Sequence, residues 1–119
     1  MTRYVDGYVI PVPKKQLSAY FRMARQASKI WRGHGALNYK ECVGDDLAVK
    51  LGVGFPKGIK SKAGETVVFA WIEFKSRAHR DRVNAKVMAD PDVAALCAPE
   101  HMPFDSARML WGGFKVVVA

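Results

Sequence analysis

ETVVFAWIEFKSRAHRDRVNAKVM, residues 65–88, is the stretch that decides the fold. Within residues 66–74, both the odd-numbered and the even-numbered positions are largely apolar, and only Glu73 interrupts the run. A strand exposed on one face alternates apolar and polar residues, because successive side chains point to opposite faces. This pattern therefore predicts a central strand that is covered on both faces. Ser76 then supplies a capping oxygen for a helix over residues 77–88.

The N-terminal half predicts a strand, a helix and a second strand. Residues 3–12 form the first strand, and residues 14–33 carry apolar side chains at helical spacing, as in an amphipathic helix that covers a sheet. Residues 36–43 form the second strand. Glycine and lysine are spread through residues 44–64, which we expect to be a long loop or a hairpin with irregular ends. Loops of this length are often functional or mobile.

The C-terminal part predicts one more short helix and one more strand. Asp90 caps a helix over residues 91–96, which begins with a proline. A turn-rich segment, residues 97–106, leads into a final strand over residues 108–118 that is again apolar on both parities. The main order of strand, helix, strand, strand, helix, strand is that of an α+β ferredoxin-like βαββαβ sandwich, here a single domain over residues 1–119.

This topology leaves one face of the sheet without helices. Residues 67–74 and 108–118 nevertheless carry large apolar side chains toward both faces. A bare face of this kind exceeds the few hundred Å² of apolar patch that a monomer usually exposes. Either a second copy of the chain or a stacked ligand must cover it. A twofold homodimer through the sheet face is the simpler expectation.

Composition and cysteine content predict a globular protein of the cytoplasm. Half of the 119 residues are hydrophobic and a quarter are charged, which is usual for a folded domain. No apolar run approaches the roughly 20 residues that cross a bilayer, and no signal-peptide pattern is present. Cys42 and Cys97 match no metal spacing, and His34, His79 and His101 are scattered, so we expect no metal and no cofactor.

The net charge of +8 is concentrated near the first helix. No acidic residue lies between Asp6 and Glu41. The solvent side of the helix over residues 14–33 therefore has a basic stripe without local partners. The stripe consists of Arg22, Arg25, Lys29 and Arg32. It could attract nucleic acid, an acidic partner or an anionic substrate, or it could be an ordinary solvated face.

Four titratable residues are candidates for catalysis. Asp6 and Glu73 lie in strands that should be adjacent and central, where an apolar setting would raise the pKa of a carboxyl group toward neutral pH. The alternative is that each carboxylate is simply paired with a basic group or a backbone donor. His34 and His79, near the ends of the two longer helices, could flank a cleft or serve a structural role.

Aromatic residues could form the walls of such a small-molecule site. The candidates for substrate binding are Trp71, Phe104, Trp111 and Arg108. We expect a mostly apolar pocket between the sheet, the helices and the turn-rich segment at residues 97–106. The alternatives are that the aromatic rings only fill the core and that Arg108 forms a local ion pair with Asp105.

Three blocks of the sequence resemble a known family. YVDGYVIPVPKK near the start, GETVVFAWIEFKSRAHRDRVNAKVM in the middle and MPFDSARMLWGGFKV near the end are similar to the YbaA-like family of uncharacterised bacterial proteins. The resemblance implies a dimeric α/β barrel, in which two ferredoxin-like subunits pack sheet to sheet. That superfamily includes small monooxygenases, haem-degrading enzymes and dechlorinases. It implies no particular catalytic residue, because the family itself has no established reaction.

Two classes of function follow from the sequence. The first is a small-molecule enzyme or binder, of the cofactor-independent monooxygenase type that the resemblance suggests. The second is a non-enzymatic module that binds nucleic acid or an acidic partner through the basic stripe. FAWIEF, residues 69–74, resembles the third-strand motif of RNA-recognition modules. Val67 and Val68, however, stand where that motif has a basic residue and a glycine.

Overall fold

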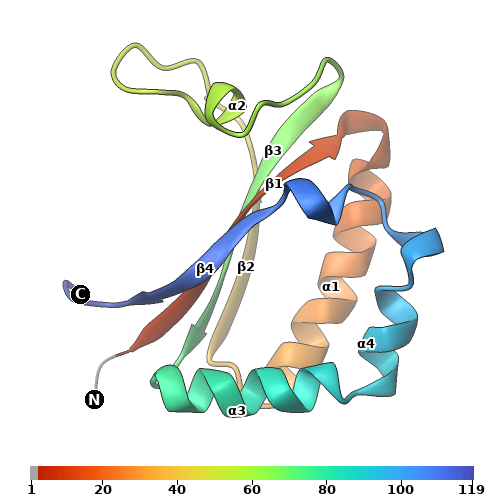
Figure 1. Ribbon diagram of the computed structural model, residues 1–119, viewed down its shortest axis with the longest axis vertical. Helices are drawn as coiled ribbons and strands as arrows, with labels where there is room; N and C mark the ends of the chain where they lie inside the picture. Colours follow the sequence, from red (N-terminus) through yellow and green to blue (C-terminus); the bar gives the residue numbers. More distant parts are fainter. Residues whose placement is uncertain (1–2) are drawn as a thin grey trace.

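The computed structural model describes residues 3–119, and its central feature is a twisted four-stranded antiparallel sheet. Figure 1 shows the helices within residues 17–33 and 77–96 gathered on one side of this sheet, while most of the other side is open. The strands lie in the order β2-β3-β1-β4, the ferredoxin-like arrangement that the sequence predicts. The strands are β1 (Tyr4–Pro13), β2 (Asn38–Val43), β3 (Glu65–Phe74) and β4 (Leu110–Lys115). The helices are α1 (Leu17–Gly33), α2 (Phe55–Gly58), α3 (Arg77–Met88) and α4 (Pro91–Leu96).

The strand register assigns each side chain to one of the two faces. Asp6 of β1 pairs with Ile72 of β3, and Gly7 pairs with Trp71. Because side chains alternate along a strand, the even-numbered residues of β1 point toward the helices and the odd-numbered ones toward the open face. Ile10 and Val12 are accordingly buried under the helix layer.

The helix α1 packs on the sheet through small side chains. Ala24 and Ala27 are buried on its inner face, together with Tyr20 one turn earlier. These residues recur at helical spacing, and the two alanines let the helix backbone approach the strands closely. Tyr20 and Ala24 join Ile10, Val12 and Val68 in one of the two hydrophobic clusters of the core.

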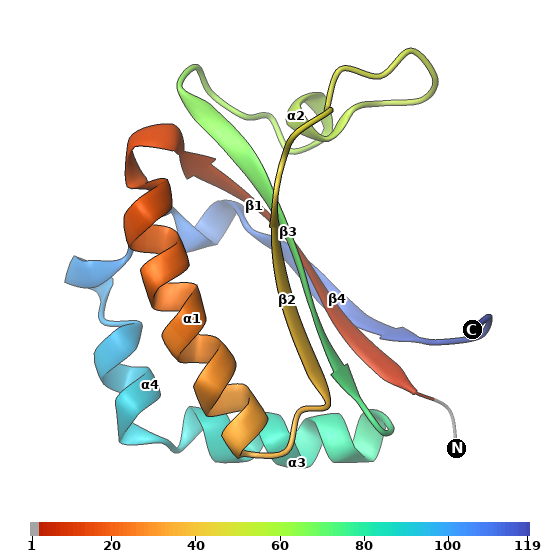
Figure 2. The same ribbon diagram turned by 180° about the vertical axis from the view of Figure 1, so that it is seen from behind.

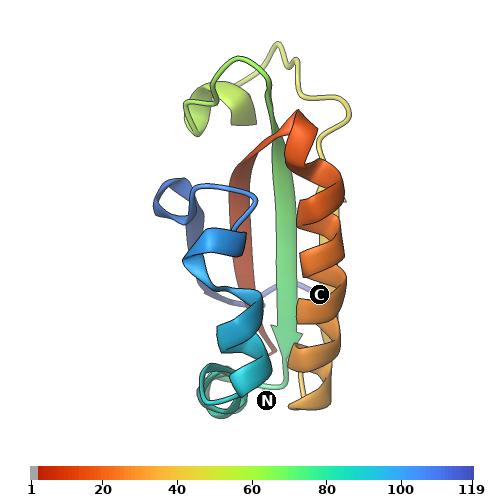
Figure 3. The ribbon, with the colours of Figure 1, turned by 90° about the vertical axis from the view of Figure 1, so that its right-hand side faces the viewer.

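The helix α3 crosses the end of the sheet rather than running beside α1, as Figures 1 and 2 both show. Ser76 Oγ accepts a hydrogen bond from the His79 backbone N–H at 3.1 Å, which confirms the predicted cap. Val83 and Val87 are fully buried in the second hydrophobic cluster, against Phe74 and its neighbours. Figure 3 looks onto the helix layer, where α4 lies beside α1.

Two strands are shorter than the sequence predicts. The strand expected over residues 36–43 begins at Asn38, because Ala36 still belongs to the turn after α1, where its backbone N–H donates to Trp31 O at 3.0 Å. The strand expected over residues 108–118 begins at Leu110, because Ser106–Arg108 form a short 3-10 helix. It ends at Lys115, which pairs with Tyr4, the first residue of β1.

The segment at residues 44–64 contains the short helix α2 and forms an arm that projects away from the helix layer (Figures 1 and 2). The ring of Phe55 in α2 lies 6.2 Å from the ring of Phe69, which is on the open face of β3. The arm therefore leans over one end of the open face. None of the helices in residues 3–119 is long and apolar enough to cross a membrane.

The open face is apolar and bare within one chain. Phe69 is 43% exposed, Leu110 56% and Phe114 63%. The helices of this chain therefore supply only one of the two covers that the sequence predicts for β3. Covering the other side requires something outside the chain.

Candidate functional site

A cavity of about 200 Å³ lies between α1, the sheet and the segment that follows α4. Its walls are mostly apolar, which is the usual make-up of a small-molecule site. Its apolar lining includes Met23, Trp31, Ile72, Leu96, Met102, Phe104 and Met109. Its polar lining includes Tyr8, Tyr20, Tyr39, Glu41, Cys97 and Ser106.

Glu41 is the central acidic group of this cavity. Tyr20 of α1 donates a hydrogen bond from its hydroxyl to Glu41 Oε1 at 2.8 Å. Tyr39 donates from its hydroxyl to Glu41 Oε2 at 2.9 Å. Tyr39 and Glu41 are two residues apart in β2, so both point toward the helices. The helix and the strand together hold the carboxyl group in one orientation, with one tyrosine on each oxygen.

The surroundings raise the pKa of Glu41. Burial disfavours the charged carboxylate, and this effect outweighs the two tyrosine hydrogen bonds, which lower the pKa. Burial also raises the pKa values of Tyr20 and Tyr39, as does the negative charge of Glu41 beside them. The two hydroxyl groups therefore stay protonated as donors. Glu41 is the member of this group that can gain or lose a proton as the pH changes.

Glu41 also borders a shallow hollow on the outside of the protein. This hollow lies between α1 and β2, and Phe21, Arg25 and Ser28 also line it. Glu41 thus lines both the inner cavity and the hollow. A carboxyl group in this position can exchange a proton with water and with a molecule bound in the cavity.

Asp6 does not line this cavity. Its side chain lies under α3 instead. Asn84 Nδ2 donates to Asp6 Oδ2 at 3.3 Å, while Arg80 Nε lies 3.7 Å from Asp6 Oδ1, beyond hydrogen-bond distance. Burial raises the pKa of Asp6, and the positive charge of Arg80 opposes this shift. The side chain is fully buried between α3 and β1. This is the paired core carboxylate that we considered as the alternative.

The other three predicted catalytic residues lie elsewhere. Glu73 is on the open face, 3.5 Å from Arg3, because it is adjacent to Ile72, the partner of Asp6, and so points to the opposite side. His34 Nε2 lies 2.8 Å from Asp90 Oδ2. His79 Nδ1 accepts a hydrogen bond from the Lys75 backbone N–H at 3.0 Å, and burial lowers the pKa of its ring. The expected grouping of these residues with Asp6 in one site is wrong.

The predicted wall residues are divided between two places. Phe104 lines the cavity with Glu41, where its ring lies 5.4 Å from that of Tyr20 in an edge-on arrangement. Trp71 belongs to the open face. Trp111 stacks on Tyr8 with ring centres 6.1 Å apart and also borders the open face.

Arg108 has a structural partner that the sequence did not indicate. It donates two hydrogen bonds to Glu65, at 2.6 and 2.9 Å, and this contact joins the start of β3 to the turn before β4. Asp105 instead caps that turn by accepting from the Ala107 backbone N–H at 3.0 Å. The expected ion pair of Asp105 with Arg108 is therefore replaced by one with Glu65. We find no role for Arg108 in the cavity.

The sequence analysis did not identify Glu41 as a candidate site residue, although its position in the predicted strand gave an indication. In the strand predicted over residues 36–43, Tyr39, Glu41 and Val43 alternate onto one face, and Glu41 is the charged residue among them. A carboxylate on the inward parity of a strand indicates either a buried pair or a functional group. The partner Tyr20 is 21 residues away in another element, so its contact could not be inferred from the local pattern.

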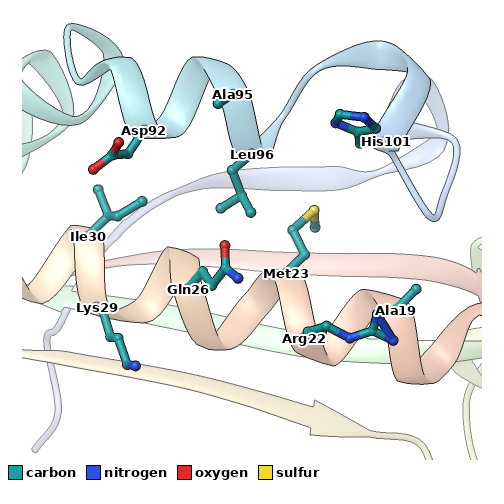
Figure 4. Close-up of a pocket in the computed structure, with 10 residues that line it drawn as sticks. All are labelled: Ala19, Arg22, Met23, Gln26, Lys29, Ile30, Asp92, Ala95, Leu96 and His101. Carbon is teal, nitrogen blue, oxygen red and sulfur yellow. The ribbon is translucent and has the colours of Figure 1, made fainter.

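A second, more open groove runs between α1 and α4. Figure 4 shows Met23, Ile30 and Leu96 pointing into it, with Arg22 and Lys29 along the α1 side. Asp92 and His101 lie on the opposite side. Two residues of the basic stripe predicted on α1, Arg22 and Lys29, therefore line this groove, whereas Arg25 borders the hollow beside Glu41 and Arg32 donates to the Tyr39 backbone carbonyl at 3.2 Å. Within residues 3–119, no group of three or more His, Cys, Asp or Glu side chains is placed to hold a metal ion.

Together, the fold and the cavity define a ferredoxin-like α+β protein with a mostly apolar cavity that contains Glu41. Residues 3–106 match DUF1428, a family described as proteins of unknown function, and the chain belongs to this family. It is 39% identical over 116 residues to the uncharacterised protein YbaA of Escherichia coli K12, covering 98% of this chain and 97% of YbaA. The YbaA protein of Shigella flexneri matches to the same extent.

A solved structure agrees with the fold at low sequence identity. A dimeric ferredoxin-like protein from an uncultured marine organism superposes with a TM-score of 0.64. The match covers 100% of this chain and 99% of that protein, with 11% sequence identity. The likeness confirms the ferredoxin-like arrangement of helices and strands.

Proposed function

We propose that this protein is a homodimer that binds a small, largely apolar molecule in the Glu41 cavity and exchanges a proton with it. The observation that carries the proposal is the Glu41 carboxyl group, held by Tyr20 and Tyr39 in a mostly apolar cavity. A few convergent polar groups in an apolar pocket fix the orientation of a ligand. A carboxyl group with a raised pKa can act as an acid or a base near neutral pH.

The size of the cavity limits the ligand. An engineered apolar cavity of about 150 Å³ holds benzene. The cavity of about 200 Å³ next to Glu41 therefore suits a molecule the size of a single substituted ring. The ligand should carry one hydroxyl, carbonyl or amine group to meet Glu41, because an unpaired polar group in this setting is costly.

The proposed chemistry is a single proton transfer. The ionised Glu41 carboxylate takes a proton from an acidic O–H or C–H group of the ligand, leaving the ligand as an anion and Glu41 neutral. Return of the proton regenerates the starting state. A reaction of the cofactor-independent monooxygenase type would begin with the same step, in which the enzyme base makes the substrate electron-rich.

The homodimer in this proposal forms through the open sheet face. Its support is the apolar character of the face and the closed twofold symmetry that most soluble oligomers adopt. The apolar residues on this face include Val5, Val9, Phe69, Trp71, Leu110 and Phe114. The proposal places the dimer in the cytoplasm, in keeping with two cysteines that are both free thiols.

A second candidate function uses the groove between α1 and α4. Its cationic rim, including Arg22 and Lys29, favours an acidic partner or a nucleic acid backbone. The apolar base of the groove makes an acidic peptide the better fit of the two. This candidate requires no chemistry at Glu41, so the two functions can be tested separately.

A thermal-shift screen of single-ring compounds tests the main proposal. Compounds that stabilise the wild-type protein should lose their effect on the Glu41→Gln variant, because glutamine cannot accept or release the proton. Glu73→Gln is the matched control, since the same substitution is made on the open face, away from the cavity. Equal stabilisation of all three proteins would contradict the proposal, and so would a complete absence of stabilising compounds.

A further inference from the structure

Two glycines face each other in the middle of the open sheet face. Gly7 of β1 and Gly112 of β4 are direct partners across the strands. Both are on the parity that points away from the helices. With no side chains there, they form the floor of a hollow of about 680 Å³. Its walls come from Val5, Val9, Phe69, Trp71, Leu110 and Phe114, with Tyr8 and Trp111 at the edge.

The chain itself does not require glycine at either position. Both residues have the extended backbone of a strand, unlike Gly35, Gly52 and Gly64, whose φ angles are positive. A Cβ atom added at Gly7 would lie 3.6 Å from Phe114 Cε1, and one added at Gly112 would lie 3.9 Å from the same atom. These are ordinary van der Waals distances.

The neighbouring Gly113, in contrast, must be glycine because of contacts within the same chain. A Cβ atom there would overlap the side chains of Tyr4 and Arg80, so this glycine is needed within the monomer. Glycine weakens a strand, and it often marks a site where another group approaches the backbone. On the open side, Phe114 is the side chain that approaches Gly7 and Gly112, and it would still leave room for a Cβ atom at each. The chain therefore does not itself fill the space over the two glycines, and a group from outside can.

We infer that the hollow over Gly7 and Gly112 is a socket for a large apolar side chain of a second copy of this chain. The hollow is almost entirely apolar, so it offers no polar partner to a charged or strongly polar ligand. The arm beside this face carries exposed apolar side chains that match such a socket, with Leu51 94% and Val53 70% exposed. A surface with both a hollow and matching protrusions can complement itself across a twofold axis.

This inference rests on the homodimer of the proposed function and adds its main specificity determinant. It also distinguishes a dimer whose two hollows are empty from a dimer in which a partner side chain fills each hollow. If the two hollows stayed empty in the dimer, they would enclose a chamber for a ligand. If a partner side chain fills each hollow, any bulk added at the glycines must push the subunits apart.

Valine substitutions separate these possibilities. Gly7→Val and Gly112→Val suit a strand conformation, and each adds branched bulk to the floor of the hollow. We expect each to weaken the dimer about tenfold or more, since overpacking a filled space costs about 1–3 kcal/mol, equivalent to about 5–150-fold in a dissociation constant. Sedimentation equilibrium over a dilution series measures this constant directly.

The control is Gly33→Val. A Cβ atom at Gly33, at the end of α1, meets nothing within 4 Å, so the dimer should be unchanged. Gly7→Ala and Gly112→Ala serve if a valine variant does not fold, and they should weaken the dimer in the same direction but less. A monomeric wild-type protein would overturn the homodimer itself. A dimeric wild type whose glycine variants associate equally well or more tightly would overturn the socket alone.

Discussion

Tyr20 of α1 and Glu41 of β2 are joined by a hydrogen bond of 2.8 Å across the space between the helix layer and the sheet. This contact ties the cavity wall on one side to the cavity wall on the other. The tyrosine hydroxyl donates, and burial keeps it protonated, so its only role toward Glu41 is to stabilise negative charge. The acidity of Glu41 therefore depends on Tyr20.

Tyr20→Phe removes this donor while leaving the ring in place. We expect the pKa of Glu41 to rise further, because burial remains and one of the two lowering hydrogen bonds is lost. The free energy of unfolding should fall by about 1 kcal/mol, the typical value of one hydrogen bond. A carboxyl ¹³C NMR titration measures the pKa. Tyr8→Phe is the control, since Tyr8 also lines the cavity; a rise of equal size in that variant would contradict the role given to Tyr20.

The raised pKa of Glu41 predicts a dependence of stability on pH. Between the ordinary value of 4.5 and the higher folded-state pKa, the folded protein holds a proton that the unfolded chain has released. Stability should therefore fall as the pH rises through this window and then level off. The Glu41→Gln variant should lack this component. Asp6 shifts in the same direction, so the difference between the wild type and Glu41→Gln is the quantity to compare in urea unfolding.

Glu65 predicts the opposite dependence. Hydrogen bonds from Arg108 and from the Lys62 backbone lower its pKa to about 2. Its contribution to stability is present above the ordinary value of 4.5 and is lost as the pH falls toward 2. Glu65→Gln should be less stable than the wild type at neutral pH, and the difference should disappear in acid. An unchanged difference at low pH would show that the Arg108 contact is not electrostatic in origin.

The sequence could predict the layers of this fold because they depend on local patterns. Apolar residues at helical spacing over residues 14–33 predicted the helix that covers the sheet, and Ser76 marked the start of α3. The site was harder to predict from the sequence, since it depends on which residues from different elements come into contact. Asp6 and Glu73 are in adjacent strands, yet a difference of one position in register places them on opposite sides of the sheet. The contact of Glu41 with Tyr20 depends on how α1 lies on the sheet, which no local pattern specifies.

The basic stripe on α1 predicts only weak binding of nucleic acid. Contacts to phosphate groups release counterions, so affinity should fall steeply with salt and vanish near physiological ionic strength. Replacing the four residues of the stripe with glutamine should abolish this binding; they are Arg22, Arg25, Lys29 and Arg32. The matched control removes four positive charges elsewhere, by replacing Lys50, Lys57, Lys62 and Lys115 with glutamine. Tight, sequence-specific binding at physiological salt would favour the second candidate function over the first.

The most direct test of the central claim uses the methionine methyl groups as reporters. Met102 and Met109 line the Glu41 cavity, whereas Met88 is exposed outside it, and Met23 borders both the cavity and the α1–α4 groove. Methyl NMR spectra recorded during titration with single-ring compounds should show shifts at the cavity methionines Met102 and Met109 but not at Met88, and Glu41→Gln should reduce these shifts. If no compound shifts the cavity methionines, or if Glu41→Gln binds each compound as the wild type does, then the Glu41 cavity is not the functional site.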